Sequence, residues 1–181
     1  MTVPEYIQLR AFARVDGARL ALLWVASFAC YVWGLKSPEL GLLSLGLALA
    51  TPFYCTRRLR RFKADALDGQ PISFGRGYAY VVFMFLYACL LFAAAQFVYF
   101  NFIDKGYFIG AISDMMAQAT SAATVGTALG AMVQEGIEAL RAMRPIDLVF
   151  NILMSNMMIG ALVALPVAAI GKSGNNSKMT Q

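Results

Sequence analysis

The apolar residues of this chain fall into four long blocks separated by short polar segments. The blocks cover about residues 18–35, 40–56, 77–102 and 146–170. A helix needs about 20 predominantly apolar residues to cross the hydrocarbon core of a bilayer, and blocks of this length are typical of membrane-spanning helices. The pattern predicts an all-α membrane protein with four transmembrane helices, forming a single domain over residues 1–171.

Turn and capping residues mark where the predicted helices begin and end. Pro38 cannot continue a helix, so residues 36–39 should form a tight turn between the first two spans. Pro52 removes one backbone hydrogen bond from the second span and predicts a modest kink. Ser73 is suited to cap the third helix, and Pro145 suits the first position of the fourth.

The segment between the third and fourth spans, residues 103–144, has a different pattern. Apolar residues recur at helical spacing in its second half, which predicts an external amphipathic helical segment. They are Val125, Leu129, Val133, Ile137 and Leu140. We expect two short helices along the outer membrane face, with a break near residues 121–124. The alternative is that residues 119–133 enter the membrane as a fifth span, which would move the C-terminus to the other side.

Positive charge is distributed unevenly between the two sides of the predicted spans. The side that holds both termini carries eleven Lys and Arg: Arg10, Arg14, Arg19, Arg57, Arg58, Arg60, Arg61, Lys63, Arg76, Lys172 and Lys178. The opposite side carries four: Lys36, Lys105, Arg141 and Arg144. Since cytoplasmic loops are enriched in Lys and Arg, both termini should be cytoplasmic, with residues 172–181 forming a disordered tail.

Composition supports a membrane environment and argues against nucleic acid as a partner. Charged residues make up 14% of the chain, against about 25% in soluble domains, and 60% of residues are hydrophobic. The net charge of +5 arises largely from one loop beside a predicted span, where anionic lipid headgroups are the nearer partner. The lipid bilayer and its anionic headgroups are therefore the expected partners, and no nucleic acid is expected.

That loop contains a dense group of basic residues. They are Arg57, Arg58, Arg60, Arg61 and Lys63, which follow the second span directly. Two interpretations remain open: the group fixes the topology of the chain, or it forms a specific contact site for anionic lipid. Each basic residue near an anionic membrane surface contributes about 1 kcal/mol of attraction, so either interpretation is physically reasonable.

Polar residues within the predicted spans also need a role. They are Gln96, Asn101, Asn151, Ser155 and Asn156. Gln96 and Asn151 should both lie roughly 8–9 Å below the outer boundary, at about 1.5 Å per residue, so we expect interhelical hydrogen bonds between them. Lining of a small cavity is the alternative. The small residues Gly160, Ala164 and Ala168 continue from Asn156 at a spacing of four, which predicts that this face meets another helix.

The sequence offers no recognisable catalytic or metal-binding pattern. It contains no His, and Cys30, Cys55 and Cys89 are widely spaced in apolar surroundings. A Cu(I) site built from the many methionines lacks a nearby His or Cys. All ten acids map to loops or helix ends in the predicted topology, which disfavours ion-coupled transport. We expect no enzyme activity and no cofactor.

Several short motifs resemble a known family. They are Thr51-Pro52-Phe53 with Thr56-Arg57-Arg58, Gly69 with Ile72-Ser73-Phe74, the run Tyr99–Asp104, and a fourth span ending through Leu165-Pro166. Together they resemble the family catalogued as domain of unknown function 4199, found mainly in Bacteroidota. The resemblance implies a multi-pass protein of the bacterial inner membrane. It implies no activity and no functional residues.

Two kinds of function fit these observations. The first is a non-catalytic accessory or scaffold subunit that binds another membrane protein or a second copy of the chain. The alternative is a small oligomeric transporter or a lipid-handling, flippase-like component.

Overall fold

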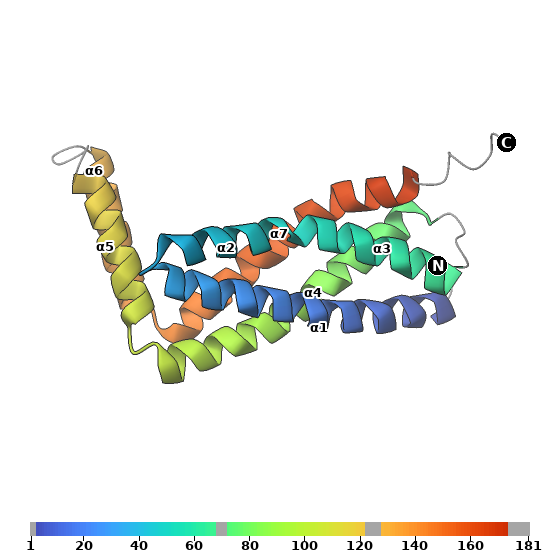
Figure 1. Ribbon diagram of the computed structural model, residues 1–181, viewed down its shortest axis with the longest axis horizontal. Helices are drawn as coiled ribbons and strands as arrows, with labels where there is room; N and C mark the ends of the chain where they lie inside the picture. The colour runs from blue at the N-terminus through green and yellow to red at the C-terminus, as the bar shows by residue number, and fades with distance from the viewer. Residues whose placement is uncertain (1–2, 68–71, 122–127, 174–181) are drawn as a thin grey trace. The chain divides into compact units, whose positions relative to one another are not determined.

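The chain folds entirely into helices in the part that the structure describes. The computed structural model describes residues 3–67, 72–121 and 128–173. In chain order the elements are α1 (Val3–Gly34), α2 (Pro38–Leu49), α3 (Thr51–Leu67), α4 (Phe74–Val98), the π-helical turn η1 (Tyr99–Ile103), α5 (Tyr107–Ser121), α6 (Ala128–Ala142) and α7 (Pro145–Ser173) (Figure 1). The all-helical part of the predicted fold class is therefore confirmed.

Four of the described helical segments are long and apolar enough to cross a membrane. They are Val3–Gly34, Pro38–Leu67, Phe74–Ile103 and Pro145–Gly171. Three of them contain one predicted span each, and the first covers the predicted span 18–35 up to Gly34. The local boundary predictions hold at two places: the Arg76 backbone N–H donates to Ser73 Oγ at 3.3 Å, and α7 begins at Pro145.

The chain forms two compact units. The first contains Met1–Ala93 and Ile152–Gln181, and the second contains Ala94–Asn151. The first unit thus holds α1, α2, α3, most of α4 and most of α7. Its core is formed by buried residues of these helices, among them Leu20, Leu59, Tyr80, Met84 and Val167.

Small residues allow the helices of the first unit to approach closely. A Cβ atom at Gly17 of α1 would lie 2.7 Å from the carbonyl oxygen of Met84 in α4. A Cβ atom at Gly160 of α7 would lie 2.6 Å from Cγ of Phe85. Gly160, Ala164 and Ala168 are all buried. The prediction that this face of α7 meets another helix is confirmed, and the other helix is α4.

The second predicted span lies in one helical segment that is interrupted at Ala50, close to the predicted kink at Pro52, and the interruption divides it into α2 and α3. α2 ends at Leu49 and α3 begins at Thr51, with Ala50 between them. Pro52 has no N–H, and its ring would meet the carbonyl four residues earlier in a continuous helix. Hydrogen bonds from Ala50 to the carbonyl of Gly46 and from Tyr54 to the carbonyl of Ala50 keep the two helices joined. The break is thus one residue wide.

The first helix is much longer than the first predicted span. Residues 3–17 continue α1 toward the N-terminus, and Leu9 and Ala13 in this extension are fully buried. Asp16 therefore lies inside a helix and is only 6% exposed. The prediction that every acid lies in a loop or at a helix end is wrong at this position. The mixed polar pattern of the extension arises because only one side of it is packed.

The second unit contains a helical hairpin made by α5 and α6, which lie side by side in Figure 1. The chain enters α5 through Lys105 and Gly106, with φ of 46° and 86°. Glycine adopts such angles without steric cost. Asp104 is buried and accepts hydrogen bonds from the Tyr99 hydroxyl and the Phe108 N–H, both at 2.9 Å. These bonds fix the turn that leads into the hairpin.

Two helices between the third and fourth spans were expected, and α5 and α6 are those helices. The expected break near residues 121–124 falls largely outside the described residues, as do the side chains of Val125 and Leu129. The external position of the hairpin stays a prediction, and so does its amphipathic character. The rival fifth span at 119–133 also includes residues that are not described. At the other end, α7 continues through Ser173, past Pro166 and into the expected tail, whose remaining residues are not described.

Candidate functional site: a cavity between helices and a buried charge cluster

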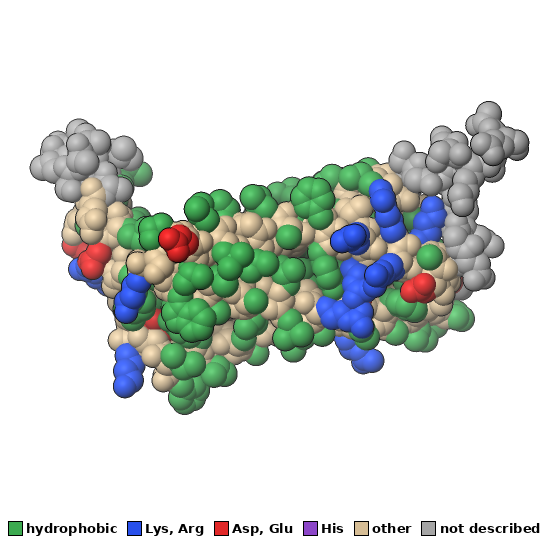
Figure 2. All heavy atoms as spheres, in the orientation of Figure 1, with side chains coloured by type: hydrophobic (Ala, Val, Ile, Leu, Met, Phe, Trp, Pro, Cys, Tyr) green, Lys and Arg blue, Asp and Glu red, His purple; other side chains and the backbone are tan. Residues whose placement is uncertain are grey.

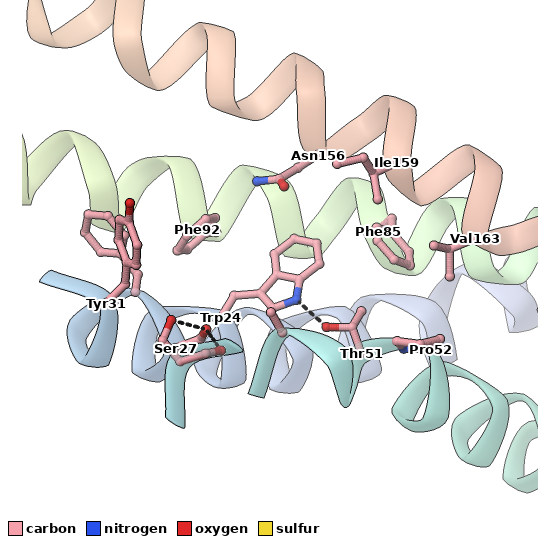
Figure 3. A pocket seen from close by; sticks show the side chains of 13 residues that line it. Trp24, Ser27, Tyr31, Thr51, Pro52, Phe85, Phe92, Asn156, Ile159 and Val163 are labelled. Carbon is pink, nitrogen blue, oxygen red and sulfur yellow. Dashed lines mark hydrogen bonds between the residues drawn. The ribbon is translucent and has the colours of Figure 1, made fainter. Parts of the chain in front are cut away.

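The first unit contains a partly open cavity of about 460 Å³ that is lined by α1, α2, the start of α3, α4 and α7. Figure 3 shows Trp24 near its centre, with Phe85 and Phe92 behind it and Asn156 facing it from α7. Ligand pockets in proteins have volumes of about 300–1,000 Å³ and are mostly apolar with a few polar groups. The cavity fits this description in both size and composition.

Hydrogen bonds on one side of the cavity tie α1 to the broken helix. The Trp24 indole N–H donates to Thr51 Oγ1 at 3.1 Å, and Ser27 Oγ donates to the backbone carbonyl of Ser44 at 3.0 Å (Figure 3). Ser27 and Ser44 also lie within hydrogen-bonding distance through their hydroxyls, at 3.3 Å. Both seryl side chains are buried and paired, so they contribute structure to the wall of the cavity rather than open binding groups.

Aromatic rings form a large part of the lining around Trp24. Trp24 packs edge-to-face on Phe85, with ring centroids 5.4 Å apart, and on Phe92 at 5.7 Å. Phe28 packs in the same way on Phe92 at 5.9 Å. Edge-to-face pairs at these distances are the favoured aromatic arrangement and hold the rings in fixed positions. The cavity therefore has a rigid wall, because each ring is oriented by its neighbour.

The Asn156 amide and the Tyr31 hydroxyl are polar groups on the lining. Asn156 of α7 is half-buried, lines the cavity and points toward Trp24 in Figure 3. No described residue lining the cavity carries a charge. Sequence reasoning placed Asn156 among the residues that make interhelical contacts or line a cavity, and the structure favours the cavity.

A second feature of the first unit is a charge cluster built around the buried acid Asp16. Its carboxylate lies 3.2 Å from Arg58 Nε and 3.4 Å from Arg19 Nη1. The Tyr80 hydroxyl donates to the same carboxylate at 2.5 Å. Arg58 also donates to the Tyr54 hydroxyl at 3.1 Å, and that hydroxyl donates to the Asp16 backbone carbonyl at 3.4 Å. The cluster thus joins α1, α3 and α4.

Sequence reasoning missed this cluster, although the sequence contains a signal for it. Leu9, Ala13, Asp16 and Leu20 follow one another at spacings of four, three and four, and all four are buried. Residues at these spacings share one face of a helix. An acid within such an apolar stripe must find a partner, because an unpaired buried charge is very costly.

Beside the cluster lies a hollow of about 390 Å³ between α1 and α3. Arg19, Arg58 and Arg61 line it together with Asp16 and Asp65, so acids accompany the arginines. Figure 2 shows Lys and Arg side chains gathered over α1 and α3 at this end of the unit. The basic side chains of α3 do not form one uniform site. Arg58 is mostly buried in its ion pair, whereas Arg57, Arg60 and Arg61 are exposed and Lys63 is half-buried.

The other polar residues predicted to pair within the membrane are placed differently. Gln96 is 2% exposed, and its Oε1 has no hydrogen-bond partner among the described residues. Asn151 is exposed, so the structure does not form the expected bond between Gln96 and Asn151. Asn101 and Ser155 are exposed as well. The physical reason is rotation: equal depth in the membrane does not bring two side chains together unless both helices turn those faces toward each other.

The described residues include no group of three or more His, Cys, Asp or Glu placed to hold a metal ion. The three cysteines are free thiols, with Cys55 and Cys89 buried. The first unit has a mostly apolar cavity with the Asn156 amide on its lining, and charged side chains at one end.

Comparison with known proteins places the chain in a family without assigning a function. Neither the curated proteins nor the solved structures contain a match to it. One family model matches residues 16–173, which include three of the four candidate spans completely and the first from residue 16 onward. The chain therefore belongs to the family described as protein of unknown function (DUF4199).

Proposed function

We propose that this protein is a non-catalytic membrane protein that binds a neutral, largely apolar molecule of the bilayer in the cavity of its first unit. It would act as a lipid-handling accessory protein. The observation that carries the proposal is the cavity itself, whose 460 Å³ is about three times the roughly 150 Å³ cavity that holds benzene in an engineered protein. That space is enough for a chain or ring system of a membrane lipid.

The lining defines the chemistry of the ligand. An uncharged lining with aromatic walls favours an apolar body, since a charged group would lose its hydration without finding a partner. The Asn156 NH2 group can donate to a hydroxyl, ester or ketone oxygen, and its amide oxygen can accept from a hydroxyl. The expected ligand therefore has a long apolar part and one small uncharged polar group.

The proposed orientation and location of the protein follow from the distribution of Lys and Arg between the two sides of the spans. Lys and Arg predominate on the side of the termini, which supports an inner-membrane protein with both termini in the cytoplasm. In this topology the cavity lies within the bilayer, because Trp24, Thr51, Phe92 and Ile159 all belong to candidate spans. A ligand dissolved in the bilayer would reach it laterally, between helices.

Trp24 provides a direct test. The chain has two tryptophans, and Trp33 is 67% exposed, so Trp33→Phe leaves Trp24 as the reporter inside the cavity. The protein in micelles is titrated with a brominated long-chain alcohol, which quenches indole fluorescence on contact. We expect quenching that saturates. Val163→Phe fills the cavity and should abolish saturation, whereas Leu162→Phe, on the exposed side of α7, should leave it unchanged.

The outcomes decide between binding and nonspecific contact. Quenching that rises without saturation, or that is equal in the Val163→Phe and Leu162→Phe proteins, contradicts the proposal. Mass spectrometry of the purified protein should also detect a neutral lipid that is depleted in the Val163→Phe protein.

A further inference from the structure

The basic residues of α3 lie on two different sides of the helix, and the two sides have different surroundings. On the side facing α1, Arg58 is paired with Asp16, and the hollow that Arg61 lines also contains Asp65. Acids of the chain therefore compensate much of the positive charge there. This side has little capacity left for an added anion.

The side facing α7 is different. Arg60 and Lys63 line a hollow of about 320 Å³ together with Ile170 and Gly171. No acid lines this hollow in the described part of the chain, and neither cation is in an ion pair there. The sequence after Gly171 contains Lys172 and Lys178 but no Asp or Glu. Among the described residues, Asp65 of the same helix lines the hollow on the α1 side and not this one, so no acid shares the hollow with Arg60 and Lys63.

Close packing fixes the position of this hollow. A Cβ atom at Gly171 would lie 2.6 Å from Cδ2 of Leu59, so α7 lies directly on α3 at this level. Arg60 follows Leu59 in the chain, and Lys63 is three residues further along the same side of the helix. Ile170 lies at the end of the fourth predicted span, where phospholipid phosphates are found. The two cations are therefore held at the boundary between hydrocarbon and headgroups.

We propose that this groove between α3 and α7 binds the headgroup of an anionic phospholipid. The phosphate lies between the Arg60 guanidinium and the Lys63 ammonium, and each donates hydrogen bonds to its oxygens. An acyl chain follows the exposed apolar side of α7, along Ile170 and Leu162, which are 47% and 66% exposed. Residues 162, 166 and 170 are spaced by four and share this side of the helix.

The site is separate from the cavity and does not depend on its ligand. The competing explanation is that Arg60 and Lys63 only stabilise the C-terminal end of α7, where helical carbonyls lack partners. That interaction would be the same in any lipid, whereas a headgroup site responds to the charge of the lipid. The two explanations therefore predict different dependence on lipid composition.

The test measures the unfolding temperature of the full chain in nanodiscs of phosphatidylcholine, with and without phosphatidylglycerol. The variant Arg60→Gln/Lys63→Gln is compared with Arg57→Gln/Arg61→Gln, which removes the same charge from exposed positions of the same helix. We expect phosphatidylglycerol to stabilise the parent and the Arg57/Arg61 variant equally. The Arg60/Lys63 variant should lose most of this stabilisation, and its retention of phosphatidylglycerol should fall about 10- to 30-fold.

Three results would overturn the proposal. If both variants lost the stabilisation by phosphatidylglycerol to the same extent, general surface charge would be responsible for that stabilisation. A destabilisation of the Arg60/Lys63 variant that is the same in both lipid compositions would indicate stabilisation of α7 alone. Stabilisation of the parent by millimolar inorganic phosphate in phosphatidylcholine discs would indicate an anion site without lipid specificity. If the double variant does not fold, Arg60→Lys/Lys63→Arg, which keeps both charges, must retain the phosphatidylglycerol effect, and its loss would equally contradict the proposal.

Discussion

Replacing Asp16 with asparagine tests whether the buried charge cluster holds the first unit together. The change keeps the size of the side chain and removes its charge. Arg58, whose side chain is 12% exposed, then loses the carboxylate at 3.2 Å that neutralises it, and Tyr80 loses a charged acceptor. Arg19 is less affected, because its side chain is 55% exposed and can be solvated by water.

The expected loss of stability in Asp16→Asn follows from the burial of Asp16 and Arg58. Removing one member of a buried ion pair costs about 3–5 kcal/mol, because the remaining charge has no partner. Arg58 keeps its hydrogen bond to Tyr54, so we expect the low end of this range, about 3 kcal/mol. For a chain of this length about 1 kcal/mol corresponds to about 2–4 °C, so Asp16→Asn should lower the unfolding temperature by about 6–12 °C.

Asp147→Asn is the matched control. Asp147 and Arg144 form a pair with two hydrogen bonds of 2.7 and 2.9 Å, yet their side chains are 45% and 76% exposed. Exposed ion pairs contribute about 0–1 kcal/mol to the free energy of unfolding, even when the charged atoms are close together. We therefore expect the control to lower the unfolding temperature by no more than about 4 °C, taking about 1 kcal/mol as the upper limit.

The assay is thermal unfolding in detergent, followed by tryptophan fluorescence, for Asp16→Asn, Arg58→Gln and the double variant. A coupling energy above about 1 kcal/mol between the two positions is expected, because they contact directly. The reasoning would be refuted if Asp16→Asn cost no more than Asp147→Asn, or if the effects of Asp16→Asn and Arg58→Gln were additive.

Three further predictions concern packing and topology. Gly160→Ala should destabilise the protein by about 1–3 kcal/mol, because the new Cβ atom would meet Phe85. Gly46→Ala adds a Cβ atom with nothing within 4 Å, so it should be neutral or stabilise the protein by up to about 1 kcal/mol. Equal unfolding temperatures for the two variants in the same thermal assay would contradict this prediction. A reporter fused after Asp68 should be cytoplasmic and one fused near Gln118 external, and the reverse would overturn the proposed orientation. In nanodiscs, hydrogen exchange across residues 128–142 should be slowed as in a stable helix, and fast exchange throughout would mean that α6 does not persist.

The four spans could be read from the sequence because a membrane helix is specified locally. Its backbone hydrogen bonds close within the segment, so a run of about 20 apolar residues is sufficient. The cap at Ser73 and the start at Pro145 were predictable for the same reason, since each depends on neighbouring residues only. The stripe from Gly160 to Ala168 was predictable as an interface because small residues in register favour close helix packing.

The polar contacts were decided by tertiary structure. The apolar stripe of α1 indicates that Asp16 lies on its buried face, but Tyr80 is 64 positions away, and no local pattern identifies it as the partner. Gln96 and Asn151 have suitable depths but do not pair, since Asn151 is turned outward. The rotation of each helix about its axis is set where backbones approach most closely, at Gly17 against Met84 and at Gly160 against Phe85. These contacts join segments far apart in the chain, so the sequence determined which segments are apolar and long enough to cross a membrane, and packing between helices determined which of their residues meet.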